Sequence, residues 1–401
     1  MQIPTRRRPS GGDPLPRDVY LLSAIAFLVA VGFGVIVPVL PVFARTFDAS
    51  NFMVGAVVSG FALMRLMTAP GCPWIGHRIG ERATLGLGIL IVAGSSAATG
   101  LARSYPQLLV MRGIGGIGSA MFTVSAMTLL VRSVDAGRRG RASAVYQSGF
   151  LIGGMAGPAV GAVLASISLR APFFFYAVTL TFAGVVGLVL LSPPAVREPG
   201  AGRPPGMPLV TALRDVRYRV VLTTMFAQGW QTQGVRSTLV PVLVVETLHR
   251  SPTWTAIAFA AAAVVQTAAI GPSGRAVDER GRRGAMIAAG LITGLAALAT
   301  PFVPSIWVLT GILCISAVGS ALNSTAPTAA VGDVIGTAGG QPIAVFSMTG
   351  DVGAILGPLV AGIVADQLGL PAAFAVGAAL LLVAAGYATR MPRDGRRPAA
   401  A

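Results

Sequence analysis

The chain has 401 residues, of which 54% are hydrophobic and only 11% are charged. Long apolar segments recur throughout, so the composition excludes an ordinary soluble enzyme or binding domain and indicates a membrane protein with several spans. The formal net charge is +16 and all basic residues are arginines. These arginines lie in short clusters between apolar segments, so we do not expect nucleic acid as a partner. The two cysteines, Cys72 and Cys314, provide neither a disulfide framework nor metal-ligand spacing.

Twelve apolar segments are long enough to cross a bilayer as helices, since each has roughly 20 residues or a little more. Their apolar character is continuous rather than alternating, which excludes β-barrel strands. We therefore predict an all-α membrane protein. The predicted helices have cores at 20–44, 53–75, 84–102, 107–131, 142–166, 172–192, 220–245, 253–274, 285–303, 306–330, 342–365 and 372–390.

An internal repeat divides these helices into two pseudo-symmetric bundles of six. The first copy contains glycines at every fourth position, which share one side of a helix and allow another backbone to approach closely. These residues are Gly149, Gly153, Gly157, Pro158 and Gly161. The second copy, with Gly353, Gly357 and Pro358, follows 200 residues later. A repeat of half the chain length indicates two homologous halves. We expect these glycine-proline segments to lie at the boundary between the halves.

The domain organisation follows from this repeat. A stretch rich in proline, glycine and arginine separates the sixth and seventh helices, and such a composition is typical of a linker. We expect a tail at 1–17, a first bundle at 18–192, a linker at 193–218, a second bundle at 219–391 and a tail at 392–401.

Arginine placement predicts the orientation in the cell membrane. One set of alternate loops contains most of the arginines, whereas the other set contains only Arg45, Arg103, Arg170 and Arg250. Arginine-rich loops remain cytoplasmic, so we expect both termini in the cytoplasm.

Six helices, a linker and six further helices resemble the major facilitator superfamily. The segment from Gly274 through Asp278 to Gly281 and Arg282 resembles that family's signature for the loop after the second helix of a half. Its first-half counterpart is altered and contains His77, Arg78 and Gly80. The segment that starts at Arg112 resembles the family's fourth-helix motif. The glycine-proline repeat resembles the fifth-helix motif of the 12-helix drug:proton antiporters.

This resemblance implies transport by alternating access, in which the two halves rock about a cargo site near the bilayer midplane. It implies that the first, fourth, seventh and tenth helices of the chain line the cavity. It also implies that helices two and eleven, and helices five and eight, face each other across the halves. A proton gradient is the expected energy source, with no bound cofactor or metal. One chain contains a whole pathway, so a monomer is sufficient.

Asp351 is the only acidic residue well inside a predicted span, near the bilayer midplane. An unpaired carboxylate at this depth costs roughly 2.5 kcal/mol or more, which makes a functional role the default hypothesis. Arg65 lies at a matching depth in helix two, so we predict an ion pair between the halves that transport must break. Reversible protonation would make Asp351 a coupling site, and the alternative is a permanent structural ion pair.

Two further arginines, Arg112 and Arg236, lie inside predicted spans. The resemblance links Arg112 to proton transfer, and the alternative is a packing donor to nearby carbonyl groups. Arg236 follows the most polar run in any span, and we expect this run to contact cargo or to form hydrogen bonds between helices. The run contains Gln228, Trp230, Gln231 and Gln233. Weaker candidates for the cavity are Asn323, Thr325, Tyr146, Gln147 and Phe346.

Asp278 is expected to face the start of helix five, where an anion suits the positive end of the helix dipole. This contact would close the cytoplasmic side without taking part in chemistry. The matching residue in the first half is His77, which cannot provide the same attraction when neutral. The Arg65–Asp351 pair could therefore replace the first-half contact.

The sequence thus predicts a proton-coupled exporter of small amphipathic molecules, with the lipid bilayer and a small substrate as its partners. The spans contain three arginines against one aspartate, so we expect neutral or anionic cargo rather than cationic cargo. An importer or facilitator of a small metabolite is the alternative. A sensor or scaffold without transport is a third possibility. An enzyme is not expected, since no GxSxG motif, metal-ligand cluster or phosphate loop is present.

Overall fold

The computed structural model describes residues 15–134, 138–191, 208–335 and 341–392, and its regular secondary structure in these ranges is helical. The first half contains α1 (Arg17–Ile36), α2 (Leu40–Arg45), α3 (Asn51–Thr68), the 3₁₀ turn η1 (Ala69–Gly71), α4 (Cys72–Ile79), α5 (Glu81–Leu101), α6 (Tyr105–Arg132), α7 (Arg139–Ile167) and α8 (Ala171–Leu190).

The second half contains α9 (Leu209–Arg214), α10 (Val216–Gly229), the π-helix η3 (Trp230–Arg236), α11 (Ser237–Val242), the π-helix η4 (Leu243–Thr247), α12 (Pro252–Arg280), α13 (Arg282–Ala299), the 3₁₀ turn η5 (Thr300–Phe302), α14 (Ile306–Ile335), α15 (Gln341–Leu368) and α16 (Leu370–Ala388).

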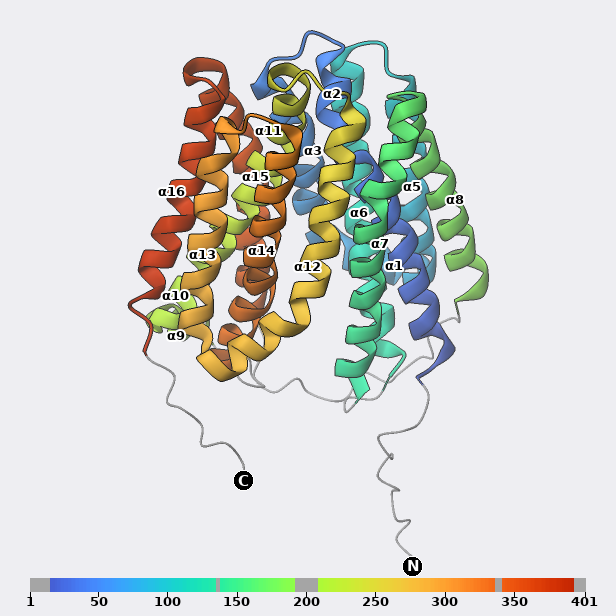
Figure 1. Cartoon of the computed structure of the whole chain (residues 1–401). Helices are drawn as coiled ribbons and strands as arrows, with labels where there is room; N and C mark the ends of the chain where they lie inside the picture. The colour runs from blue at the N-terminus through green and yellow to red at the C-terminus, as the bar shows by residue number, and fades with distance from the viewer. Residues whose placement is uncertain (1–14, 135–137, 192–207, 336–340, 393–401) are drawn as a thin grey trace, which may run out of the picture.

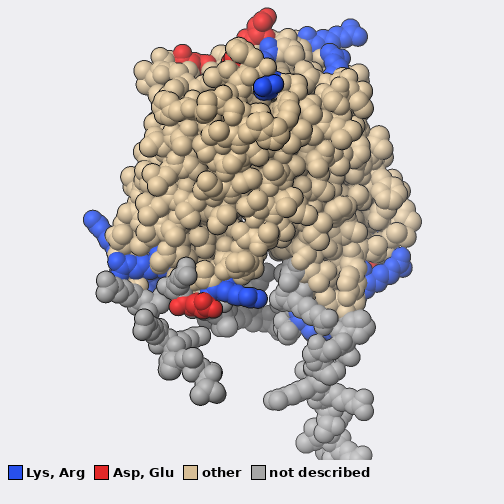
Figure 2. Space-filling view, in the orientation of Figure 1, with Lys and Arg blue, Asp and Glu red and all other residues tan. Residues whose placement is uncertain are grey.

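The helices form one bundle with two ends. The base is the end where α1 begins and α16 finishes, and the top is the opposite end, near α2 (Figure 1). A broad uncharged belt separates the charged residues at the top from those at the base (Figure 2). Within the described residues, eleven helices are long and apolar enough to cross a membrane. The chain is therefore a multi-pass membrane protein.

The seventh predicted span is present as a broken helix. It runs through α10, η3, α11 and η4, where two π-helical segments interrupt the α-helical hydrogen bonding. With this broken span added to the eleven uninterrupted ones, the structure confirms the predicted all-α architecture with twelve crossings. π-Helical turns are rare and occur frequently at functional sites.

Helix two covers the predicted span at 53–75, within the candidate membrane span Asn51–Ile79. It is interrupted at η1, where Pro70 lacks a backbone N–H group and Gly71 follows. Hydrophobicity alone did not predict this interruption. The short α4 continues beyond the break.

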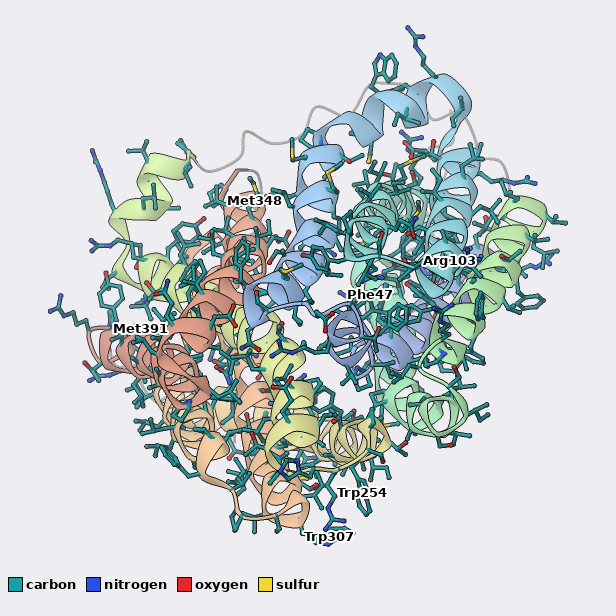
Figure 3. The ribbon with its side chains drawn as sticks, turned by 90° about the horizontal axis from the view of Figure 1, so that it is seen from above. Phe47, Arg103, Trp254, Trp307, Met348 and Met391 are labelled. Atoms are coloured by element: carbon teal, nitrogen blue, oxygen red, sulfur yellow. The ribbon has the colours of Figure 1, made fainter. Side chains whose placement is uncertain are left out.

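The bundle divides into two groups of helices when viewed from above (Figure 3). Arg103 lies in the first group, and Trp254 and Trp307 lie in the second. The main contacts between the groups join α3 to α15 and α7 to α12. These pairs are helices two and eleven and helices five and eight, so the expected facing pairs are confirmed. Helices α7 and α12 diverge toward the base (Figure 1).

The repeated glycines themselves pack within each half, while the segments that contain them lie at the boundary between the halves, as expected. A Cβ at Gly149, Gly153, Gly157 or Gly161 would meet the main chain of α1. A Cβ at Gly353 or Gly357 would meet the main chain of Phe226, Trp230 or Gly234. The helices that contain these glycines do reach the boundary, since a Cβ at Gly55 in α3 would meet the Pro358 carbonyl.

Candidate functional site: a charged cavity between the halves

A cavity of about 590 Å³ lies between the two halves. Its volume falls within the range of small-molecule sites, roughly 300–1,000 Å³. Its wall comes from both halves and includes residues of α1, α3, α6, α7, η3, α12 and α15. Helices one, four and seven were expected there. Helix ten was also expected, but no described residue of α14 lies at the wall, so that expectation was wrong for this conformation.

Most of the cavity wall is apolar, and four charged side chains interrupt it. The charged residues are Arg65, Arg112, Arg236 and Asp351. The aromatic residues at the wall are Phe33, Phe61, Phe122, Phe150, Tyr176 and Phe259. This combination suits a molecule with a large apolar part and a small number of polar groups.

Arg65 and Asp351 form the ion pair expected from their matching depths. Arg65 Nη2 donates a hydrogen bond to Asp351 Oδ1 over 2.6 Å. Arg65 lies on α3 and Asp351 on α15, so the pair joins the two halves at the edge of the cavity. Their side chains are 39% and 35% exposed. Water in the cavity can therefore reach both groups.

Arg112 is deeply buried at the cavity wall, with only 4% of its surface exposed. Its guanidinium carbon lies 4.7 Å from the centre of the Phe61 ring, which is a cation–π geometry. Arg236 lies similarly over Phe259, at 5.9 Å. The structure thus places each arginine on an aromatic surface at the wall of the same cavity.

The polar run of helix seven mostly faces the interior of the second half. Asn323 Nδ2 donates to Gln228 Oε1 over 3.2 Å, and Gln228 Nε2 donates to Thr232 over 3.4 Å. Trp230 and Gln231 are buried where α16 approaches, since a Cβ at Gly377 would lie 2.8 Å from Gln231 Oε1. The side chain of Gln233 lies outside the described part of the structure.

Of the residues expected to contact cargo, the structure brings Arg236 to the wall. Of the glutamines, Gln228 makes the hydrogen bond between helices that was the alternative, whereas the buried Gln231 Oε1 accepts no hydrogen bond from the described residues. Thr325 bonds to carbonyl groups of its own helix, and Tyr146 packs against Phe150. Gln147 is exposed and Phe346 is partly buried in the α10–α14 region, away from the cavity wall.

The loop motifs after helices two and eight share one backbone feature. Gly80 and Gly281 have φ angles of +89° and +84°, a conformation that strongly favours glycine, and each directly precedes a helix. Arg282 Nε lies 2.9 Å from Asp333, so the second motif is tied to the end of α14. A Cβ at Gly274 would meet no atom within 4 Å.

In the first-half motif, Arg82 stands where Arg282 stands in the second, and it donates hydrogen bonds to the Leu188 carbonyl of α8 rather than pairing with an acid. His77 is exposed, and Arg78 is stacked on Trp74 at 4.4 Å. The side chain of Asp278 lies outside the described part of the structure. Its expected contact with helix five therefore stays a prediction.

Two polar contacts that join the halves at the top were not predicted from the sequence. Asp366 of α15 accepts hydrogen bonds from the backbone N–H groups of Asn51 and Phe52, each over 2.8 Å. Arg45 Nε lies 2.9 Å from Glu246. The spacing of residues in the sequence does indicate the first of these contacts. Helices two and eleven run antiparallel, and Asp366 follows Asp351 at nearly the same spacing by which Asn51 precedes Arg65.

The comparisons with known proteins agree on one family. The family model of the Major Facilitator Superfamily matches residues 22–235 and 232–401. The quinolone resistance protein NorA of Staphylococcus aureus is 25% identical over 183 residues, which is 44% of this chain and 46% of NorA. The multidrug efflux protein YfmO of Bacillus subtilis is 29% identical over 210 residues, which is 52% of this chain and 51% of YfmO. The matches to these curated relatives thus span about half of their length.

Solved structures share the fold. A bacterial homologue of the human lysosomal transporter Spinster, in an inward-facing and occupied conformation, has a TM-score of 0.77 at 17% identity. The match covers 95% of this chain and 98% of that one. The human organic anion transporter MFSD10 has a TM-score of 0.64 at 19% identity, with 93% and 100% covered. The two matches to the family model together cover nearly the whole chain, and the chain belongs to the Major Facilitator Superfamily of membrane transporters.

Proposed function

We propose that this protein is a proton-coupled exporter of small amphipathic molecules that works by alternating access. The cavity between the halves is the cargo site. The arginine-rich base is the cytoplasmic end, and both termini lie on that side. In this orientation the top contacts close the outer side while α7 and α12 separate toward the cytoplasm (Figure 1). The structure then represents an inward-facing state.

The ion pair between Arg65 and Asp351 is the observation that supports coupling most directly. It is formed by residues from opposite halves, and it lies beside the cargo cavity. Protonation of Asp351 removes the negative charge and weakens the pair, whereas deprotonation restores it. Proton binding and closure of this contact therefore compete, so a proton gradient can shift the equilibrium between the two orientations of the halves.

The charge at the cavity wall supports neutral or anionic cargo. Three arginines and one aspartate give the described wall a net charge of +2, and a cation would be repelled in this low-dielectric setting. The similarity to the quinolone resistance protein NorA and to the multidrug efflux protein YfmO supports export of drug-like molecules.

Transport in proteoliposomes with an imposed pH gradient tests the proposal. We expect the wild-type protein to accumulate members of a mixed drug and metabolite panel, and Asp351→Asn to lose gradient-driven accumulation while it still binds cargo. Asp48→Asn is the matched control, because Asp48 is an exposed acid at the top with a positive φ angle that asparagine tolerates.

Unchanged accumulation by Asp351→Asn would remove the coupling role. Equal transport with and without an uncoupler would instead favour the importer or facilitator alternative. Loss of accumulation in Asp48→Asn as well would show that the assay reports general damage and would remove the support from Asp351.

A further inference from the structure

We propose that Arg112 and Arg236 form an anion-binding site that receives the carboxylate of an amphipathic cargo molecule. This inference rests on the proposed function, because it names the chemical class of the cargo. The two arginines come from opposite halves, on α6 and η3, and both line the same cavity.

Arg112 is a buried charge whose donors are not used by the protein. Its side chain donates no hydrogen bond to any described residue, and its Nε atom is fully enclosed without an acceptor. A buried cation without a partner is costly, and proteins normally pair such a group or use it to bind a ligand. If Arg112 were only a packing donor to carbonyl groups, it would make those hydrogen bonds in this structure.

The protein holds Arg112 in place without neutralising it. Phe61 supports the guanidinium, and glycines at 115 and 116 allow α6 to lie against α3 at this point, since a Cβ on either would meet Phe61. A guanidinium fixed on an aromatic ring loses little entropy when it binds a planar carboxylate through two hydrogen bonds. The site is therefore preorganised for an anion.

Arg236 supplies a second cation on the opposite half. It lies over Phe259 of α12, and it makes no hydrogen bond or ion pair with the described residues. Asp351 does not neutralise either arginine, because it is engaged by Arg65. No other acidic residue lines the described cavity wall. Since no further acid of the described residues faces the two arginines, an anion that enters the cavity would balance their charge.

The rest of the cavity wall defines the other part of the ligand. Val29, Phe33, Phe122, Phe150 and Met155 provide apolar surface in the same cavity. The combination of two cations and an apolar wall suits a molecule with one acidic group on an aromatic or alkyl body. A zwitterion with an amine near the carboxylate would bring its positive charge close to the arginines, and we expect it to bind more weakly.

Direct binding to the purified protein in detergent tests this inference without any transport step. The probes are 1-naphthaleneacetic acid, its neutral amide and 1-naphthylethylamine, which share one ring system and differ in charge. We expect the wild-type protein to bind the acid at least about tenfold more tightly than the amide, since hydrogen bonds to charged groups are worth roughly 1.5–3 kcal/mol. We expect the amine to bind most weakly.

Single substitutions of the arginines test where the acid binds. Arg112→Gln and Arg236→Gln should each reduce affinity for the acid about tenfold or more and leave affinity for the amide unchanged, and Arg112→Lys should retain part of the preference. Arg103→Gln is the matched control, because its side chain is exposed in the loop before α6 and the described structure records no contact for its guanidinium. It should bind all three probes as the wild-type protein does.

Equal wild-type affinity for the acid and the amide would overturn the inference, and this comparison needs no variant to fold. A preference for the acid that both glutamine variants retain would also overturn the location of the site. The anion site and the proposed function can fail independently of each other in these experiments. Proton-driven export without a preference for the acid would remove only the anion site, whereas a preference for the acid without any export would remove only the exporter.

Discussion

The two halves of the molecule share one helix crossing and differ in what surrounds it. In the first half, Gly34 of helix one meets Gly157 of helix five, and in the second half Gly234 of helix seven meets Gly357 of helix eleven. All four positions are related by the same offset of 200 residues. The repeat has therefore preserved a close main-chain contact between the two helices of each pair.

The difference between the halves lies in the helices that meet at this crossing. Helix one is a regular α-helix up to Ile36, whereas helix seven becomes a π-helix at Trp230, next to the glycine crossing. The second half uses this region for hydrogen bonds among Gln228, Thr232 and Asn323. The first half has no such network at α1 among the described residues. The comparison shows that a common packing contact can support two different polar environments.

The largest expected effect comes from filling the shared crossing. Gly157→Ala and Gly357→Ala each place a Cβ within 3 Å of main-chain atoms, so each should lower the free energy of unfolding by about 1–3 kcal/mol. The measurement is thermal unfolding of the purified variants in detergent. Gly154→Ala is the control on the same helix, because a Cβ there meets no atom within 4 Å. A large loss of stability for one variant and none for the other would show that the two glycine crossings are not equivalent.

The next largest effect concerns the ion pair that joins the halves. Asp351→Asn leaves Arg65 as a lone charge inside the membrane protein, and we expect a loss of about 1 kcal/mol, discounted for the partial exposure of both groups. The double variant with Arg65→Gln should recover most of this loss, because neither charge is then unpaired. Thermal unfolding of the single and double variants completes a double-mutant cycle. Strictly additive effects would show that the two residues do not interact in solution.

A smaller effect is expected at the top, where the two halves are joined through Asp366. Asp366→Asn removes a charged acceptor from two backbone N–H groups and should favour opening of the outer side by roughly 1 kcal/mol or several-fold in population. The measurement is the labelling rate of a cysteine at Phe33 by an impermeant maleimide added outside, with Cys72 and Cys314 replaced by serine. An unchanged rate would show that this contact does not hold the outer side closed.

The smallest effect is expected for the exposed ion pair between Arg45 and Glu246. Glu246→Gln should change the same labelling rate by less than about threefold, since such pairs are worth roughly 0–1 kcal/mol. The effect should disappear at 1 M salt, where exposed charges are strongly screened. A change larger than that of Asp366→Asn would reverse the ranking of the two top contacts.

The sequence was informative about depth in the membrane and poor about direction around a helix. Arg65 and Asp351 could be paired because distance from a helix end is a simple count of residues. Cargo contact and interhelical hydrogen bonding could not be distinguished for Gln228, because hydrophobicity does not reveal which way a side chain points around its helix. The repeated glycines were recognised as a site of close helix contact, but their spacing alone could not identify the partner helix. Asp366 was missed because only acids deep within a span were considered.

The two sides of the Asp366 contact differ in how strongly they depend on side-chain identity. Two of its partners are main-chain N–H groups, which every residue except proline supplies. Position 52 can therefore vary in side chain while its bond is retained, whereas the side chains of Ser50 and Asn51 also interact with Asp366. The carboxylate has no such freedom, so natural variation that tunes how readily the outer side opens should concentrate at position 366.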